Sequence, residues 1–181
     1  MYQTVGVIEL KSIATGIEAT DAALKSAGVR LISAHPVCPG KFEIMVSGSI
    51  ADVTASLDHV KERFAGTLID ASLMGRIDPQ VITALYGTQT PSRHGSLGII
   101  ETYSAASIVK AADIAVKTAK VEIFELRLSR GMGGKGIVLV TGDVGDVTAA
   151  VEAGARHAKE QSMLNHYTVI AAPHEELWDT L

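Results

Sequence analysis

Aromatic side chains are scarce in this sequence. One Trp, four Tyr and three Phe make up 4% of the 181 residues. Surfaces that stack on nucleic-acid bases need such side chains, and duplex-binding proteins usually present a basic face. The chain instead has 16 Lys and Arg against 20 Asp and Glu, a formal net charge of −4. We therefore expect no nucleic-acid partner.

Long apolar runs and cysteines are also lacking. No window approaches the roughly 18 to 20 apolar residues that span a bilayer. The N-terminal segment MYQTVGVIELKS has no basic region before its short apolar stretch, so we expect neither a membrane span nor a signal peptide. The single cysteine, Cys38, excludes an internal disulfide and fits a reducing cytosol.

Constellations that support catalysis are missing as well. The six histidines, at positions 35, 59, 94, 157, 166 and 174, show neither H-x-x-x-H nor a His/Cys metal spacing. No Ser/His/Asp arrangement can be assembled. An apolar content of 47% with 20% charged residues is nevertheless typical of a globular chain. We expect a folded protein that is not an enzyme.

What the sequence does contain is an internal duplication. Residues 5–29 align without gaps on residues 97–121, and residues 40–55 align on residues 134–149 after a two-residue insertion. Identical pairs include Gly6 with Gly98 and Glu9 with Glu101. Fixed internal similarity identifies repeated structural units. We therefore predict two domains, 1–90 and 91–181, joined by the polar stretch TQTPSRHG.

Each copy has the same pattern of elements. In the first copy, strand-like runs alternate with two stretches of helical periodicity, and Pro79 suits the first turn of a short final helix. The expected strands are 5–10, 29–37, 42–47 and 67–74, and the expected helices are 17–27, 52–64 and 80–85. The second copy repeats this order and ends with a strand at 162–170 and a helix at 173–181. The fold class is α/β (α+β): two tandem ferredoxin-like units, each a four-stranded antiparallel sheet with helices.

These features resemble the shell-protein (BMC) domain of bacterial microcompartments. The resemblance rests on G-x-I-E near the start of each copy, D-A-x-x-K-x-A in residues 21–27, the hairpin that ends in GK, and the C-terminal PHEELWDTL. It covers both copies, in the unpermuted order. Within the family the chain is similar to the tandem-domain trimeric class, and to the type found in propanediol-utilisation shells, because VCPGKF in the first copy is matched by a glycine-rich loop in the second.

The resemblance implies a structural role. Three chains would form a homotrimer that imitates a hexagonal tile, and tiles would pack with other shell proteins into a shell within the cytoplasm. The hairpin loops would line a central pore. The residues expected in these loops are Val37, Cys38, Pro39, Gly40, Arg130, Gly131, Met132, Gly133 and Gly134.

Cys38 is the candidate metal ligand. A lone cysteine is usually a small buried hydrophobe, but Pro36, Pro39 and Gly40 predict a surface turn here. Iron–sulfur clusters are usually held by four thiolates, so one chain cannot hold one. A three-fold axis would bring three copies of Cys38 together, and the resemblance implies that they bind a 4Fe-4S cluster for electron or cluster transfer, with redox enzymes as partners. A free thiol lining a metabolite pore is the alternative.

The loop RGMGGKG (130–136) literally contains G-x-G-x-x-G. The dinucleotide fingerprint requires a helix after the glycines, whereas the strand-like IVLVTG follows here. Walker A also fails, because Ser129 occupies the first glycine position and Gly136 replaces Ser or Thr. We expect instead a flexible loop that must approach its neighbours closely, where side chains would clash.

Lys25 and Lys117 are repeat-equivalent. Each could be an ordinary solvated helix residue, and the resemblance implies that both lie at tile edges against lysines of adjoining tiles.

Two further functional classes remain open. One is a regulatory trimer that binds a small ligand between subunits, and the other is an enzyme with Cys38 as nucleophile and His35 as its base.

Overall fold

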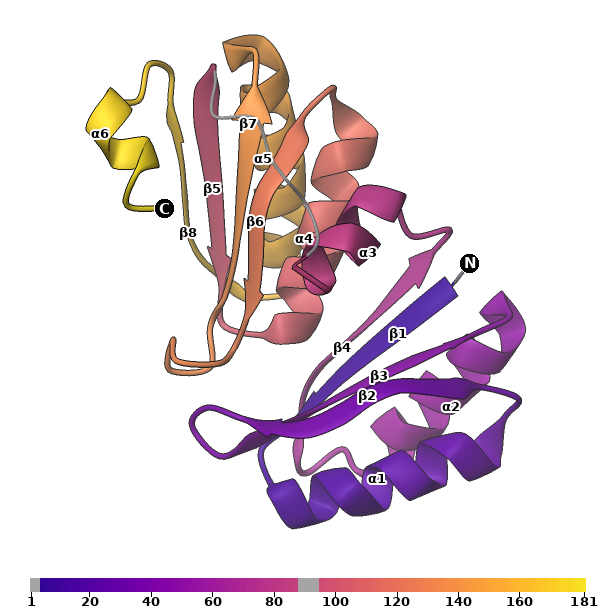
Figure 1. Ribbon diagram of the computed structural model, residues 1–181. Helices are drawn as coiled ribbons and strands as arrows, with labels where there is room; N and C mark the ends of the chain where they lie inside the picture. The colour runs from indigo at the N-terminus through magenta and orange to yellow at the C-terminus, as the bar shows by residue number, and fades with distance from the viewer. Residues whose placement is uncertain (1–3, 88–94) are drawn as a thin grey trace.

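The computed structural model describes residues 4–87 and 95–181, and these form two copies of one β-α-β-β-α-β-α unit (Figure 1). The first copy consists of β1 (Thr4–Leu10), α1 (Ile13–Ser26), β2 (Arg30–Val37), β3 (Lys41–Gly48), α2 (Ile50–Arg63), β4 (Leu68–Gly75) and α3 (Pro79–Leu85). The second consists of β5 (Ser96–Thr102), α4 (Ala105–Thr118), β6 (Glu122–Leu128), β7 (Gly136–Gly142), α5 (Val144–Glu160), β8 (Leu164–Ile170) and α6 (Glu175–Trp178). The predicted duplication is confirmed. The boundary predicted between residues 90 and 91 lies outside the described residues.

The two sheets have the same topology. Their strand orders are β2-β3-β1-β4 and β6-β7-β5-β8, and every neighbouring pair is antiparallel. The edge strands β2 and β6 are bulged at the same place, between Leu31 and Ser33 and between Ile123 and Glu125. This is the ferredoxin-like order that the alternation of strands and helices predicts. The shared bulge fixes which residues of the two copies correspond.

The first helix of each copy begins at a serine cap that the repeat preserves. Ser12 accepts a hydrogen bond from the Thr15 N–H, and its counterpart Ser104 accepts one from the Ser107 N–H. Such a side-chain acceptor satisfies one of the free N–H groups in the first helical turn. Both helices therefore start directly after the cap, at Ile13 and at Ala105. For α1 this start is four residues earlier than predicted.

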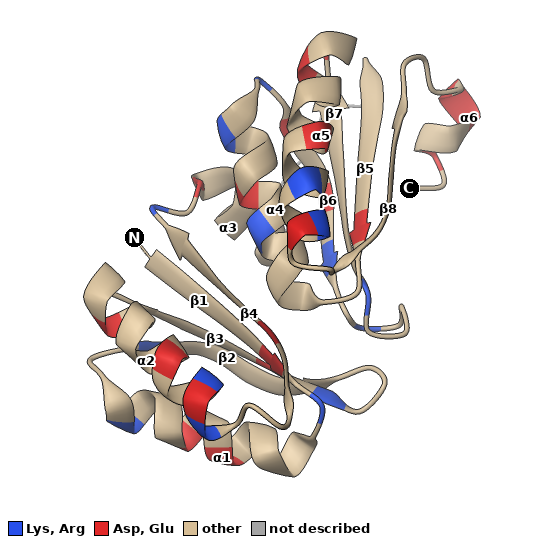
Figure 2. Cartoon of the chain, turned by 180° about the vertical axis from the view of Figure 1, so that it is seen from behind, with Lys and Arg blue, Asp and Glu red and all other residues tan. Residues whose placement is uncertain are grey.

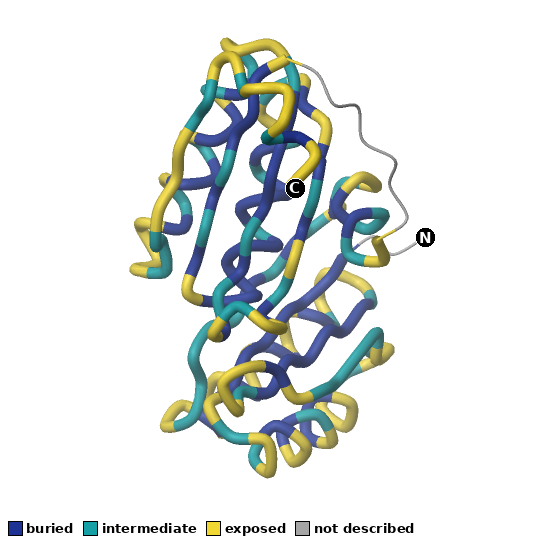
Figure 3. Tube along the Cα trace, turned by 60° about the vertical axis from the view of Figure 1, so that its left-hand side comes forward, coloured by how far each residue is buried: buried dark blue, intermediate teal, exposed yellow. Residues whose placement is uncertain are grey.

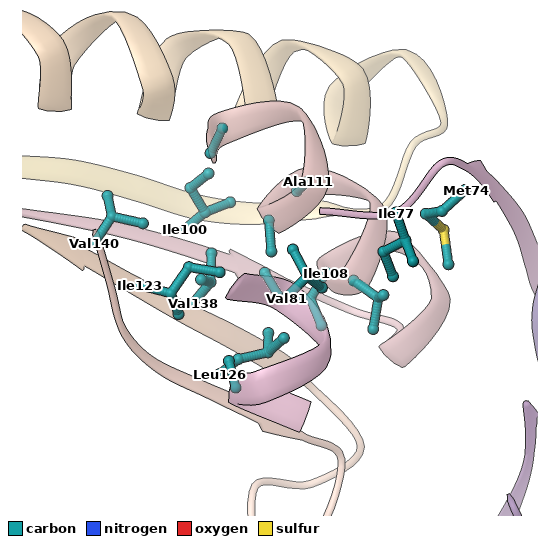
Figure 4. Close-up of a cluster of buried hydrophobic side chains, with 14 of the residues drawn as sticks. Met74, Ile77, Val81, Ile100, Ile108, Ala111, Ile123, Leu126, Val138 and Val140 are labelled. Atoms are coloured by element: carbon teal, nitrogen blue, oxygen red, sulfur yellow. The ribbon is translucent and has the colours of Figure 1, made fainter. Parts of the chain in front are cut away.

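The core is divided unequally between the copies. One cluster lies between the first sheet and α1 and α2, whereas the largest cluster combines residues of both copies. Figure 4 shows Met74, Ile77 and Val81 of the first copy beside Ile100, Ile108 and other side chains of the second. In Figure 3 the buried residues follow the strands through both copies. The copies therefore share the largest apolar cluster, and each also has a smaller cluster of its own.

Two predictions about helices need correction. The helical period of residues 17–27 predicts an apolar, inward-facing side that includes Ile17 and Leu24, but both side chains are exposed. Small residues face the interior instead, because a Cβ at Gly16 would lie 2.3 Å from the Phe42 side chain. The final helix, predicted as 173–181, is only Glu175–Trp178.

Candidate functional site

The hairpin loops of the two copies lie against each other. The β2–β3 loop and the β6–β7 loop project toward the same side of the molecule (Figure 1). Gly134 makes the contact, with a positive φ of 82°, and a Cβ there would lie 2.6 Å from the Cys38 carbonyl oxygen. Only glycine permits that approach at that backbone angle. The close contact expected of the second loop is therefore present at Gly134.

Cys38 occupies the tip of the first loop. Its thiol is free and exposed, and the Gly40 N–H closes the turn on the Val37 carbonyl at 3.0 Å. Val37 itself is buried. The prediction of a surface turn rather than a core cysteine is confirmed, and this thiol is accessible to a metal or to other copies of the chain.

The second loop is not a nucleotide-binding loop. Gly131 and Gly133 have positive φ values of 72° and 62°, and nothing lies within 4 Å of a Cβ built on either. β7 follows the loop, as predicted, so no helix N-terminus faces these glycines. Arg130 and Gly131 are exposed at the rim of the loop, Met132 is half-buried and Gly133 is exposed.

Lys41 fastens the two loops together. Its Nζ donates to the carbonyl oxygens of Gly134 and Tyr103, each at 3.0 Å, and lies 3.5 Å from Glu9 Oε1. The Ser129 hydroxyl donates to the same Glu9 oxygen at 3.2 Å. Burial raises the pKa of Glu9, and Lys41 opposes that rise. The repeat-preserved Glu is thus part of the junction between the copies, in the structural role that its position predicted.

A second set of polar contacts joins α4 to the first copy. Asp70 accepts hydrogen bonds from the hydroxyls of Ser104 and Ser107, the latter at 2.6 Å. Asp113 accepts from the Asp78 N–H at 2.9 Å, and Lys110 Nζ donates to the Leu73 carbonyl at 2.9 Å. Because Ser104, Ser107 and Asp113 are buried, these bonds fix the angle between the copies.

The two candidate edge lysines differ in environment. The Lys25 side chain is 75% exposed and pairs with Asp21 at 2.7 Å. Lys117 pairs with Asp113 at 2.7 Å, is 39% exposed, and also reaches the Gly75 carbonyl of the first copy at 3.4 Å. Within one chain, Lys117 therefore belongs to the junction between copies, whereas Lys25 is free to contact another molecule.

Sequence reasoning missed a buried carboxylate beside the loops. Glu43 is 1% exposed, and neither of its carboxylate oxygens has a hydrogen-bond partner. His35 Nε2 lies 3.6 Å from Oε1, which is too far for a hydrogen bond. Burial, and then the neighbouring Glu9, raise the pKa of Glu43 to about 7. The repeat alignment could have revealed this residue, because Glu43 stands where the second copy has Ile137, at an inward-facing strand position.

The described residues contain no cluster of three or more His, Cys, Asp or Glu groups able to hold a metal ion. One chain can supply only a single exposed thiol to an iron–sulfur cluster. Such a cluster would therefore fit only if symmetry-related copies of the chain supplied the same thiol. Within residues 4–87 and 95–181, no helix is both long and apolar enough to cross a membrane. Figure 2 shows acidic and basic residues interspersed over the helices and hairpins.

Comparison with known proteins gives the same assignment along the whole chain. The BMC domain model matches twice, at residues 4–77 and 96–173. The chain is 38% identical to the bacterial microcompartment shell protein PduT of Citrobacter freundii, over 98% of this chain and 97% of that one. This agrees with the type inferred from VCPGKF.

Solved structures agree. A microcompartment protein from Desulfitobacterium hafniense DCB superposes with a TM-score of 0.81 at 42% identity, covering 99% of both chains. A fused permuted hexameric shell protein from the RMM microcompartment superposes at 0.64 with 21% identity, over 86% of this chain and 81% of that one, which is a likeness of fold. With two matched domains and a full-length relative above 30% identity, the chain belongs to the BMC-domain family of bacterial microcompartment shell proteins.

Proposed function

We propose that this chain is a structural tile of a microcompartment shell, in which three copies close head to tail into a ring of six domains. The proposal rests on the contact between α4 and the first sheet. The chain also contains the repeat counterparts of both partners in this contact, and neither counterpart makes the contact within the chain. The counterpart of α4 is α1, and the counterpart of β4 is β8. Repeating one heterologous contact by rotation generates a closed ring.

The exposed apolar residues support this ring. Ile17 of α1 is 60% exposed, whereas its counterpart Val109 in α4 is fully buried against the first copy. Ile13 is exposed and its counterpart Ala105 is buried. On the opposite side of the chain, Tyr167 of β8 is exposed. Apolar side chains that are buried in one copy and exposed in the other indicate a surface that a second molecule covers.

The polar groups support the same closure. Ser12 and Thr15 are the counterparts of Ser104 and Ser107, and His166 is the counterpart of Asp70. Lys135, paired with Glu101 at 3.0 Å, repeats the pair formed by Lys41 and Glu9. In the ring, Lys135 would fasten the loop of the next chain as Lys41 fastens the loop of the second copy.

Sheet formation tests the role as a tile. Concentrated protein viewed by negative-stain electron microscopy is expected to form flat sheets or tubes, together with other shell proteins or alone. Lys25→Ala is expected to reduce them more than Lys117→Ala, because Lys117 already bonds within the chain. Individual particles only, at every concentration, would contradict the tile.

We further propose that Cys38 of three subunits holds a 4Fe-4S cluster at the ring axis. This proposal is supported by the exposed thiol at the tip of the β2–β3 loop, which packs against Gly134 of the β6–β7 loop. A bound cluster would supply one-electron transfer, and redox enzymes on either side of the shell would be its partners. The chain's own part is to present the thiol, to close the pore with the loops, and to tune the cluster through nearby backbone N–H groups.

Metal analysis tests this second proposal separately. Anaerobically purified protein is expected to contain iron and acid-labile sulfide at one cluster per three chains, with an electron paramagnetic resonance signal after reduction. Cys38→Ser should lose both and stay trimeric. Iron-free trimers after anaerobic reconstitution would contradict the cluster and leave the proposal of a tile intact.

A further inference from the structure

A cavity of about 400 Å³ lies at the junction of the copies, apart from the loop tips. Its walls are mainly apolar and come from three places. Val5 and Met45 contribute from the open face of the first sheet, Ile82 from α3, and Leu126 from β6 of the second copy. Glu43, His35 and Arg130 also line the cavity. It is therefore an apolar cavity with one polar wall.

The second copy fills the equivalent space. Trp178 of α6 packs on Phe124 of β6, with ring centroids 5.4 Å apart, and both are buried. Position for position, counted from the helix caps and from the shared strand bulge, their counterparts are Ile82 and Ile32. Two aromatic rings in one copy are thus two smaller side chains in the other. The cavity in the first copy is a specific difference between the copies.

The same difference introduces charge. Glu43 replaces Ile137, and it lies directly across the strand pair from Glu9. Glu9 has Lys41 as its cation and Ser129 as a donor. Glu43 has no donor, and burial and Arg130 both lower the pKa of its neighbour His35, which favours neutral imidazole. A buried carboxylate without a donor is costly. Of the nearby charges, that of Arg130 favours the ionised form of Glu43, and a second cation in contact with the carboxylate would stabilise that form further.

The residues that line the cavity indicate the chemical class of cation that it could bind. A divalent metal needs several oxygen or nitrogen ligands, and the described residues hold no group of three or more that could supply them. An anion would meet the Glu43 carboxylate. Of the two arginines that line the cavity, Arg127 is already paired with Glu125 at 2.8 Å and Arg130 is exposed. An ammonium group on a short aliphatic body meets both requirements, because the body fills the apolar part and the head donates to the carboxylate.

We propose that this cavity binds a small aliphatic ammonium ion, whose charged head pairs with Glu43 beside His35 and whose body packs between α3, the first sheet and β6. The site belongs to the junction within one chain. It requires neither ring closure nor the cluster, so its failure and theirs are separable. Ligand binding would affect the shell through α3, which connects the two copies because Gln80 donates to the Val121 carbonyl and accepts from the Ile123 N–H of β6.

The test uses three probes of equal length on the full chain. Pentylammonium, pentan-1-ol and pentanoate share a five-carbon skeleton and differ in their head group, which is cationic, neutral or anionic, and ligand-detected NMR titration measures each affinity. We expect pentylammonium to bind most tightly. Because the pKa of Glu43 is about 7, its affinity should be about tenfold higher at pH 8 than at pH 6. Equal binding of pentanol, tightest binding of pentanoate, or no saturable binding of any probe would each overturn the proposal.

Variants taken from the second copy sharpen the test. Glu43→Ile installs the residue of position 137 and should abolish the preference for ammonium. Ile82→Trp installs the residue of position 178 and should exclude all three probes. Asp58→Asn removes an exposed carboxylate of α2 and should change nothing. Unaltered pentylammonium binding in Glu43→Ile would contradict the assignment, and the probe series on the unmodified chain stands even if a variant fails to fold.

Discussion

Glu43 is the residue whose chemistry departs most from its surroundings. Its neighbours along β3 are apolar and buried, and its own oxygens have no donors. Cys38, a few residues away in the chain, is the reverse case, a thiol that most proteins bury and that here is exposed. Both residues belong to the first copy alone, so the chemical differences between the copies on which the proposals rest are concentrated around one hairpin.

The raised pKa of Glu43 predicts a pH dependence of stability. The unfolded chain loses this proton near pH 4.5, whereas the folded chain holds it to about pH 7. Folding therefore loses stability as the pH rises between these values. Relative to the unmodified chain, Glu43→Gln should gain about 2 kcal/mol between pH 5 and pH 8. Urea unfolding of both proteins at pH 5 and pH 8 measures this gain. An equal difference in the free energy of unfolding at the two pH values would show that other groups stabilise the ionised carboxylate.

Individual residues were predictable only where local chemistry decides. The prolines and glycine around Cys38 predicted its exposed turn correctly. The lack of a partner at Glu43 was not predictable, because it depends on which strand faces it and on what α3 leaves uncovered. Ile17 was placed on the buried face because periodicity cannot distinguish a core from a surface awaiting a partner.

At the scale of elements, the glycine of the G-x-I-E motif has a packing explanation. A Cβ on Gly6 would lie 2.3 Å from Leu57 of α2, and a Cβ on Gly98 would lie 2.5 Å from Val151 of α5. In each copy the second helix lies directly on the first strand. The motif is therefore a close-packing requirement of the fold.

Gly98→Ala should destabilise the second copy by about 1–3 kcal/mol, because the added methyl overpacks the interface of β5 with α5. Gly145→Ala is the matched control, since nothing lies within 4 Å of its Cβ in the same helix. That change should be neutral or stabilise by about 0.5–1 kcal/mol. Thermal unfolding compares the two, and equal effects would contradict the packing explanation.

The bonds of Asp70 give a prediction for the junction of the elements. Asp70→Ala leaves the buried hydroxyls of Ser104 and Ser107 without this acceptor, so a loss of about 1–3 kcal/mol is expected. His166→Ala, at the repeat-equivalent exposed position, should change the stability of the isolated chain by less than about 0.5 kcal/mol. Chemical denaturation in dilute solution measures both, and a similar loss in the two variants would refute the role of Asp70.

The order and type of the elements could be read from the sequence because each has a strong period or cap. Their ends were less predictable: Ser12 caps α1 before the apolar pattern begins, and α6 stops at Trp178, which packs on Phe124. Long-range packing of this kind has no local signature.

At the scale of the whole molecule, one interface is used inside the chain and its counterpart remains open. Ile17→Glu should leave the monomer folded, because the residue is 60% exposed, but should prevent ring closure. Ile50→Glu is the control. It is equally exposed at 60%, and its counterpart Val144 is also exposed, so neither faces a neighbour in the ring. Sedimentation velocity of both variants distinguishes the two surfaces, and intact rings with Ile17→Glu would rule out α1 as the interface.

The mass of the native assembly tests the central claim most directly. Native mass spectrometry of the unmodified protein should give three copies of the 19.0 kDa chain, about 57 kDa. A species of 19.0 kDa at concentrations where shell sheets should form, or a closed ring of any other number of chains, would contradict the six-domain tile.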